Sequence, residues 1–212
     1  MKYRVLLAVT GIFALLGVIP ATAQAPKGWM VRVDRSTNAS DPDAAGAIKF
    51  AAMGSGFHID SPQAGVYWNP ANTASGNYSL KGTFKLIKTS GFDEYYGLVF
   101  GGSNLQGAEQ TYLYFMVTDD GTWLVKRRTG ASTESISEKT SGSSVKKPDA
   151  SGTSTNALEV RVMADKIQFV INGMVVSTMP KTGAVAATDG VYGIRVNHHL
   201  EVQVDGFGVS KQ

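Results

Sequence analysis

Three polar residues near the C-terminal end carry the side chains best suited to bind a hydroxyl-rich ligand: Arg195, Asn197 and His198. Ile194 and Val196 alternate with the first two. Because successive side chains of a strand point to opposite faces, we expect Arg195 and Asn197 to share the face turned away from the core. A guanidinium, an amide and an imidazole all form directional hydrogen bonds with hydroxyl groups. The alternative is structural: Arg195 pairs with an acid on a neighbouring strand, and the two consecutive histidines form a turn.

Two aromatic side chains, Tyr112 and Tyr114, are spaced to lie on one face of a strand. Their neighbours Leu113 and Phe115 are the more apolar set and are expected to enter the core, which turns the tyrosines towards a groove. Sugar rings stack on aromatic faces because their C–H faces are apolar. The sequence therefore predicts stacking by Tyr112 and Tyr114, with packing inside the fold as the alternative.

A catalytic role is best assigned to His198, because an imidazole pKa lies near neutral pH and suits general acid–base chemistry. Retaining glycoside cleavage needs two carboxyl groups about 5 Å apart, and no E-x-D-x-x-E run occurs in the chain. Asp119 and Asp120 precede Gly121 and are expected to be turn residues. Asp93 and Glu94 are expected to lie in a solvated loop.

These side chains must be positioned by β-strands, because apolar and polar residues alternate along most of the chain. The alternation is clearest between residues 156 and 209, where Asn172-Gly173 separates two alternating segments. Such a pair is a strong hairpin signal, since a type I′ turn needs positive φ at both positions. Outside the N-terminal segment no apolar period of 3.6 residues is evident. About a dozen short strands predict an all-β fold, a two-sheet antiparallel β-sandwich of the jelly-roll type. The expected strands are 29–34, 48–53, 57–60, 66–68, 78–86, 95–100, 111–118, 123–128, 158–163, 167–171, 191–197 and 200–207.

Two segments lack this alternation. Residues 129–155 are rich in Ser, Thr, Lys and Gly and are predicted to form a long polar surface loop, with at most one short edge strand at residues 133–139. Residues 34–46 form a second polar loop.

The first 23 residues have the pattern of a signal peptide, with Lys2 and Arg4 before an apolar stretch and Ala21-Thr22-Ala23 at its end. Cleavage after Ala23 would leave residues 24–212 as a single exported domain, periplasmic or secreted. Loss of Lys2 and Arg4 lowers the formal charge from +3 to +1, which gives no argument for a nucleic-acid partner. No second apolar segment of membrane length follows. The chain has no cysteine, so an exported domain must be held by its core alone.

Several of these segments together resemble concanavalin A-like jelly-roll domains, and within them the 3-keto-disaccharide hydrolase-like family of secreted or periplasmic proteins. The resemblance rests on residues 96–100, 112–117, 156–160, 167–175, 193–198 and 204–207. It implies the jelly-roll fold and a link to sugar metabolism. It also implies a groove lined by polar residues at the end of the strand that carries Arg195.

Three functions follow as alternatives. The first is binding of a saccharide or a related hydroxyl-rich ligand on a concave sheet, by Tyr112, Tyr114, Arg195 and Asn197. The second, implied by the resemblance, is a hydrolase acting on a modified (3-keto) disaccharide with His198 as acid/base. The third is a non-catalytic envelope structural or adhesion module. No metal or cofactor is expected, because a zinc site would need carboxylates from distant loops beside the few histidines. Calcium held by loop oxygens is the alternative.

Overall fold

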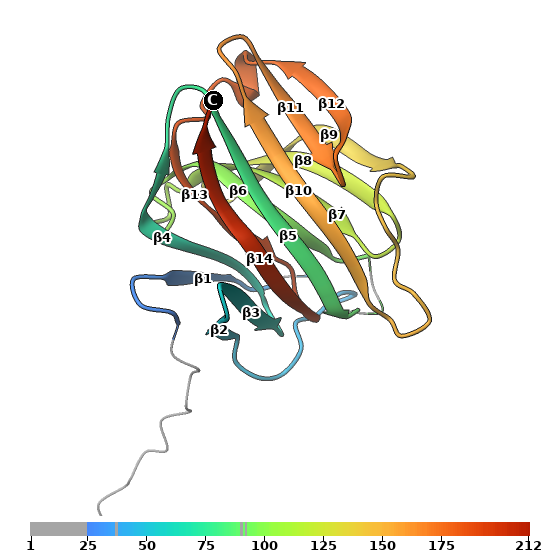
Figure 1. Ribbon diagram of the computed structural model, residues 1–212. Coiled ribbons are helices and arrows are strands. Elements are labelled where there is room, and N and C mark those ends of the chain that lie inside the picture. Colours follow the sequence, from blue (N-terminus) through green and yellow to red (C-terminus); the bar gives the residue numbers. More distant parts are fainter. Residues whose placement is uncertain (1–24, 37, 90, 92) are drawn as a thin grey trace, which may run out of the picture.

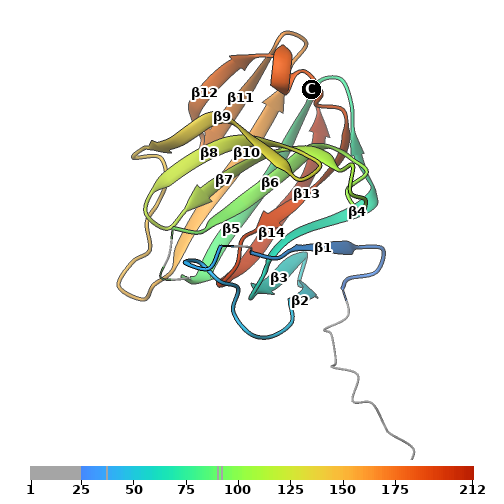
Figure 2. The same cartoon turned by 180° about the vertical axis from the view of Figure 1, so that it is seen from behind.

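The computed structural model describes residues 25–36, 38–89, 91 and 93–212. Within these residues, fourteen strands form two antiparallel sheets of seven strands each, stacked face to face (Figures 1 and 2). This arrangement confirms the predicted two-sheet β-sandwich. The predicted signal peptide, residues 1–23, lies outside the described residues. In the part of the chain that the structure describes, no helix is long and apolar enough to span a bilayer.

The first sheet, called sheet A, has the strand order β1-β4-β13-β6-β7-β8-β9. Its strands are β1 (Met30–Asp34), β4 (Ala64–Ala74), β6 (Tyr95–Ser103), β7 (Thr111–Thr118), β8 (Thr122–Thr129), β9 (Ser132–Ser141) and β13 (Gly190–Val196). In Figure 2 this sheet faces the viewer.

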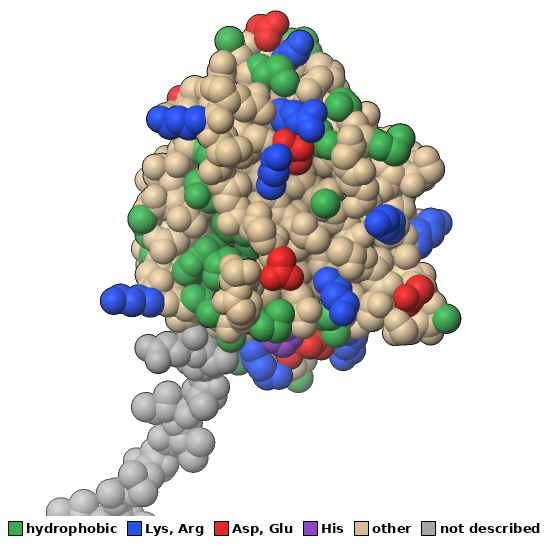
Figure 3. Space-filling model, viewed as in Figure 1, with side chains coloured by type: hydrophobic (Ala, Val, Ile, Leu, Met, Phe, Trp, Pro, Cys, Tyr) green, Lys and Arg blue, Asp and Glu red, His purple; other side chains and the backbone are tan. Residues whose placement is uncertain are grey.

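The second sheet, called sheet B, has the order β12-β11-β10-β5-β14-β3-β2. Its strands are β2 (Lys49–Met53), β3 (Gly56–Ser61), β5 (Tyr78–Lys88), β10 (Ser154–Val162), β11 (Lys166–Ile171), β12 (Met174–Pro180) and β14 (Leu200–Lys211). A short 3₁₀ helix, η1 (Gly183–Val185), precedes β13. On the outer face of sheet B, charged side chains lie scattered among polar ones (Figure 3).

The core lies between the sheets and is made by the apolar half of each alternating strand. Phe115 of β7 packs against Phe169 of β11, with ring centroids 5.1 Å apart, and so joins the two sheets. Phe100 lies 6.3 Å from the same ring. Ile194 and Val196 are fully buried here, and Arg195 between them must therefore point to the opposite face of sheet A.

The predicted hairpin at Asn172-Gly173 is confirmed. The two residues have φ values of 51° and 84°, and they connect β11 to β12 in antiparallel register. Asp120 also acts as the predicted turn residue, because its carboxylate accepts a 3.0 Å hydrogen bond from the backbone N–H of Thr122.

Residues 129–155 differ from the predicted long loop. Ser132–Ser141 forms β9, a ten-residue edge strand of sheet A that pairs with β8. Most β9 side chains are exposed, so both of its faces are polar and the alternation that marks a half-buried strand is absent. The sequence pointed to a shorter strand inside this range, and the polar loop proper is confined to the residues between β9 and β10.

Candidate functional site

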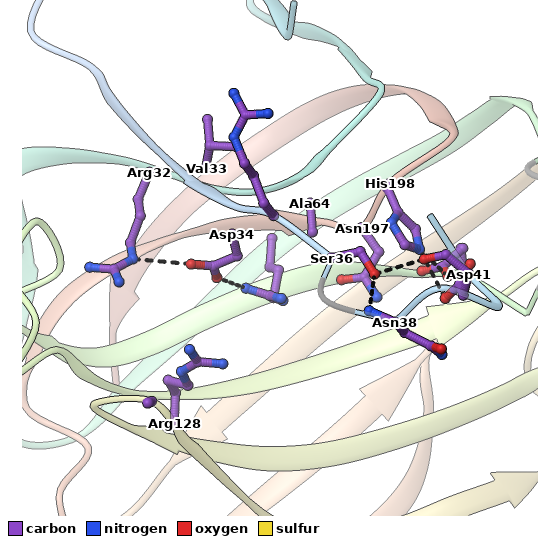
Figure 4. Close-up of a pocket in the computed structure, with 14 residues that line it drawn as sticks. Arg32, Val33, Asp34, Ser36, Asn38, Asp41, Ala64, Arg128, Asn197 and His198 are labelled. Atoms are coloured by element: carbon purple, nitrogen blue, oxygen red, sulfur yellow. Dashed lines mark hydrogen bonds and ion pairs between the residues drawn. The ribbon is translucent and has the colours of Figure 1, made fainter. Parts of the chain in front are cut away.

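A pocket of about 670 Å³ hollows the outer face of sheet A (Figure 4). Its lining comes from β1, the loop after β1, the ends of β8 and β13, and the residue before β6. Beside it, the same face of sheet A carries a compact apolar layer of eight buried residues: Val66, Trp68, Val99, Leu105, Tyr112, Tyr114, Met116 and Leu124. This layer fixes the side chains that border the pocket.

One end of the pocket is basic. Arg195 of β13 donates from Nη1 to Asp34 Oδ2 at 2.7 Å and to the Tyr112 hydroxyl at 2.9 Å. Arg32 donates from Nε to Asp34 Oδ1 at 3.1 Å. Arg128 of β8 lines the same end, with its Nε bound to the Gly130 carbonyl oxygen at 2.7 Å. Arg195 and Arg32 thus contact the carboxylate of Asp34, and Arg128 adds a third positive charge nearby. Figure 4 shows Arg32, Asp34 and Arg128 at this end of the pocket.

The electrostatics of this end keep Asp34 ionised. Burial alone would raise the pKa of its carboxyl group, but the charge of Arg195, with hydrogen bonds from Arg195 and Arg32, holds that pKa below its usual value. Burial likewise opposes the charge on Arg195, yet Tyr112 and Asp34 outweigh it and raise the pKa of the guanidinium. The pair is therefore charged at any physiological pH.

Tyr112 and Tyr114 lie on the predicted face of β7, while Leu113 and Phe115 enter the core. Both tyrosines nevertheless are buried, with 1% and 5% of their surface exposed. The predicted open stacking surface is therefore not formed, because the apolar layer on sheet A encloses both rings. Their contacts hold Arg195 instead, through the Tyr112 hydroxyl and through the Tyr114 ring, whose centroid lies 5.5 Å from the guanidinium carbon.

The other end of the pocket is acidic and centres on His198. This side chain is 5% exposed, and its Nε2 lies 2.7 Å from Glu94 Oε1 and 3.1 Å from Asp41 Oδ2. Its Nδ1 lies 3.0 Å from Asp43 Oδ1. Burial lowers the pKa of the imidazole, but the three carboxylates outweigh burial and raise it. Asn197 hydrogen-bonds to Glu94 and also lines the pocket.

The structure brings Arg195, Asn197 and His198 to one pocket, as the sequence predicted. It also shows the structural alternative to be correct in part, because Arg195 pairs with Asp34 and the two histidines form a turn in which His199 has a φ of 61°. The expectation of a solvated loop at residues 93–94 is wrong for Glu94, which is 5% exposed and faces His198.

Sequence reasoning missed Arg32, Asp34, Asp41 and Asp43. It treated Arg128 as a possible extension of the groove but favoured a solvated strand end, whereas the structure places Arg128 in the pocket lining. For β1 a signal was present, because Arg32 and Asp34 alternate with apolar residues and so share a face. For Asp41 and Asp43 the sequence carried no such signal, since their loop approaches His198 only in the folded chain.

Comparison with known proteins gives fold relatives only. No family model matches the sequence, and no curated protein matches it. Among solved structures, the carbohydrate-binding module CBM66 from Bacillus subtilis superposes with a TM-score of 0.63 at 10% identity, covering 87% of this chain and 96% of that one. A Bacillus subtilis protein of unknown function with a galectin-like fold gives a TM-score of 0.58 at 14% identity, covering 87% and 90% of the two chains.

A GH16 protein of a Bacteroides ovatus mixed-linkage glucan locus, solved with a G4G4G3G product, gives a TM-score of 0.56 at 9% identity over 87% and 94% of the two chains. These similarities define the class of the fold, a concanavalin A-like jelly-roll β-sandwich. At such identities they establish the architecture alone, and the predicted 3-keto-disaccharide hydrolase-like branch finds no support among them.

Proposed function

We propose that this protein is an exported β-sandwich that binds a saccharide, or a related hydroxyl-rich ligand, in the pocket on the outer face of sheet A. The observation that carries the proposal is the pocket itself, in which guanidinium, carboxylate and amide groups converge from four separated parts of the chain. Such fixed donors and acceptors suit the rim of hydroxyl groups on a sugar.

The pocket is preorganised for binding. Arg195 is held by Asp34, Tyr112 and Tyr114, so little side-chain entropy is lost when a ligand bonds to its free edge. Its Nε is buried and has no hydrogen-bond partner among the described residues. A buried donor without a partner is costly, and a ligand or an ordered water would satisfy it. Tyr112 and Tyr114 support the binding group, while Asn197 and His198 border the ligand.

The structural neighbours support this choice of ligand, because CBM66 is a carbohydrate-binding module and the GH16 protein was solved with a G4G4G3G product. Hydrolysis with His198 as acid/base is the alternative. It receives less support from the geometry, since carboxylates engage both ring nitrogens of His198. An imidazole held in this way is better suited to hold a charge than to exchange a proton with a substrate.

The proposal is tested by titrating the chain that begins at Gln24 with neutral and uronic acid-containing oligosaccharides, followed by calorimetry and by chromatography of the sugar. We expect binding without product. Arg128→Gln should weaken binding at least tenfold. Arg161→Gln is the matched control, because Arg161 is a half-buried arginine paired with Glu159 on sheet B, and it should leave affinity unchanged. Product formation would favour the hydrolase, and a flat response across the panel would overturn the saccharide proposal.

A further inference from the structure

The acidic end of the pocket brings together three metal-ligating side chains that are far apart in the sequence. Asp41 lies in the loop between β1 and β2, Glu94 directly precedes β6, and His198 lies in the turn between β13 and β14. One donor atom from each of these residues lies within 4.8 Å of the others. We propose that Asp41, Glu94 and His198 form a binding site for one divalent transition-metal ion such as Zn²⁺ or Mn²⁺.

The separations of the donor atoms fit a small cation. His198 Nε2 lies 2.7 Å from Glu94 Oε1 and 3.1 Å from Asp41 Oδ2. Zinc–nitrogen and zinc–oxygen bonds of about 2.0–2.2 Å place neighbouring tetrahedral donors roughly 3.3–3.5 Å apart. Each of these two pairs would therefore open by less than about an ångström to accept the ion, and the third pair, Asp41 with Glu94, lies within 4.8 Å. Asp41 is the member able to move, since its side chain is 31% exposed whereas those of Glu94 and His198 are 7% and 6% exposed.

The third carboxylate that contacts His198, that of Asp43, makes the contact that a metal-bound histidine needs. Asp43 Oδ1 lies 3.0 Å from Nδ1 of His198, the ring nitrogen that faces away from Asp41 and Glu94. A ligating histidine almost always donates its other N–H to a carboxylate or carbonyl, which fixes the ring and leaves the second nitrogen as a lone-pair donor. Asp43 thus orients His198 and is a positioning residue for the site.

The negative charge at the acidic end of the pocket also favours binding of a cation. Three carboxylates surround one imidazole, so even a positively charged ring would not balance three ionised carboxylates beside the largely buried His198 and Glu94. Asp41 Oδ1 is buried and has no hydrogen-bond partner among the described residues, and the same is true of Asn197 Oδ1. Unpaired oxygens of this kind in a partly desolvated cluster are costly, and a divalent ion would compensate them.

The donor set selects the class of ion. An imidazole nitrogen suits Zn²⁺ and related transition metals, whereas Ca²⁺ prefers six to eight oxygen ligands. Three protein ligands leave a coordination position open, and because all three residues line the pocket, that position faces the space proposed for the saccharide. Metal binding at this cluster does not depend on the proposed function and can be measured without any sugar.

The test uses untagged protein, stripped with a chelator and then loaded with Zn²⁺, Mn²⁺ or Ca²⁺. The bound metal is counted by mass spectrometry after gel filtration, and affinity is measured by calorimetry. We expect one Zn²⁺ or Mn²⁺ per chain. His198→Gln, Glu94→Gln and Asp41→Asn should abolish stoichiometric binding, while Asp43→Asn should weaken it about 10- to 100-fold.

His58→Gln is the matched control, because His58 also meets a carboxylate, with Nε2 2.8 Å from Glu201 Oε1 on sheet B. It should retain one metal per chain. Asp41→Asn keeps the test valid if the two buried ligands prove necessary for folding, as its side chain is partly exposed. A folded wild-type chain that takes up none of these ions would overturn the proposal and leave a protonated histidine among carboxylates. Metal binding that persists in His198→Gln, or binding of Ca²⁺ alone, would also overturn the proposal.

Discussion

Arg195 of β13 and Asp34 of β1 form an ion pair across the intervening strand β4, with Nη1 and Oδ2 2.7 Å apart. The two side chains are only 11% and 12% exposed. The pair joins the edge of sheet A to its centre and sets the position of the guanidinium group at the basic end of the pocket.

Removal of Arg195 should destabilise the fold. Breaking a buried pair leaves an uncompensated charge and typically costs 3–5 kcal/mol. For Arg195→Ala we expect a loss of about 3 kcal/mol, at the low end of that range because Arg32 still neutralises Asp34. Urea denaturation measures it. Lys81→Ala is the control, since Lys81 is 56% exposed in its pair with Glu159 and such pairs contribute about 1 kcal/mol or less. Equal losses in the two variants would contradict a buried, structural ion pair.

The basic end should select ligands by charge. Three guanidinium groups lie there beside Asp34, so a carboxylate on the ligand gains a charge-assisted bond that a neutral sugar does not. We expect Arg128→Gln to weaken binding of a uronic acid-containing oligosaccharide several-fold more than binding of its neutral counterpart. Calorimetry at two salt concentrations measures the effect, which should shrink at high salt. An identical loss for both sugars would show that Arg128 acts without regard to charge.

Acid should weaken the turn between β7 and β8 through Asp120. Burial would raise the pKa of Asp120, but a 2.7 Å contact with Lys139 and bonds from Thr118 and Thr122 outweigh burial and lower it. A lowered pKa in the folded state adds stability above the unfolded value, about 3.9, and this stability is lost as pH falls through the folded value. Asp120→Asn should therefore be less stable than wild type at pH 7, with the gap closing below about pH 4. Urea denaturation at several pH values measures this difference. A difference in the free energy of unfolding that does not change with pH would contradict the role of the Asp120 charge.

The loop between β9 and β10 should depend on Asn156. This side chain is fully buried; its Oδ1 accepts a 2.8 Å bond from the Lys146 backbone N–H and its Nδ2 donates to the Lys146 carbonyl oxygen at 3.0 Å. Asn156→Ala would leave both backbone groups unpaired, and we expect a loss of about 2–3 kcal/mol. Gln168→Ala is the control, an exposed amide 3.5 Å from Thr178, expected within about 0.5 kcal/mol of wild type. If Asn156→Ala leaves the free energy of unfolding unchanged, the loop is held by other contacts.

Alternation of apolar and polar residues was sufficient to predict the architecture, because strands with one buried face leave that pattern in the sequence. The range predicted for β7 is the one observed. Strand β9 was underestimated for the same reason, since an edge strand with two polar faces carries no such pattern. In β4, Pro70 and the polar residues near it obscured the second half of the strand, which continues to Ala74.

The site was predictable only where its residues follow one strand. The shared face of Tyr112 and Tyr114 and the outward direction of Arg195 follow from local periodicity. The burial of the tyrosines and the meeting of Glu94 with His198 depend on contacts between segments about 100 residues apart. No local pattern reports such contacts, which is why a glutamate before a strand looked like a solvated loop.

A saccharide bound at the basic end of this pocket should perturb the side-chain Nε–H signals of the arginines there, which can be followed by NMR in a ¹⁵N-labelled sample. On titration with an oligosaccharide that binds, we expect shifts for Arg32, Arg128 and Arg195, which line the pocket, and none for Arg161 on sheet B. Binding that shifts Arg161 and leaves Arg32, Arg128 and Arg195 unchanged would contradict binding at the basic end.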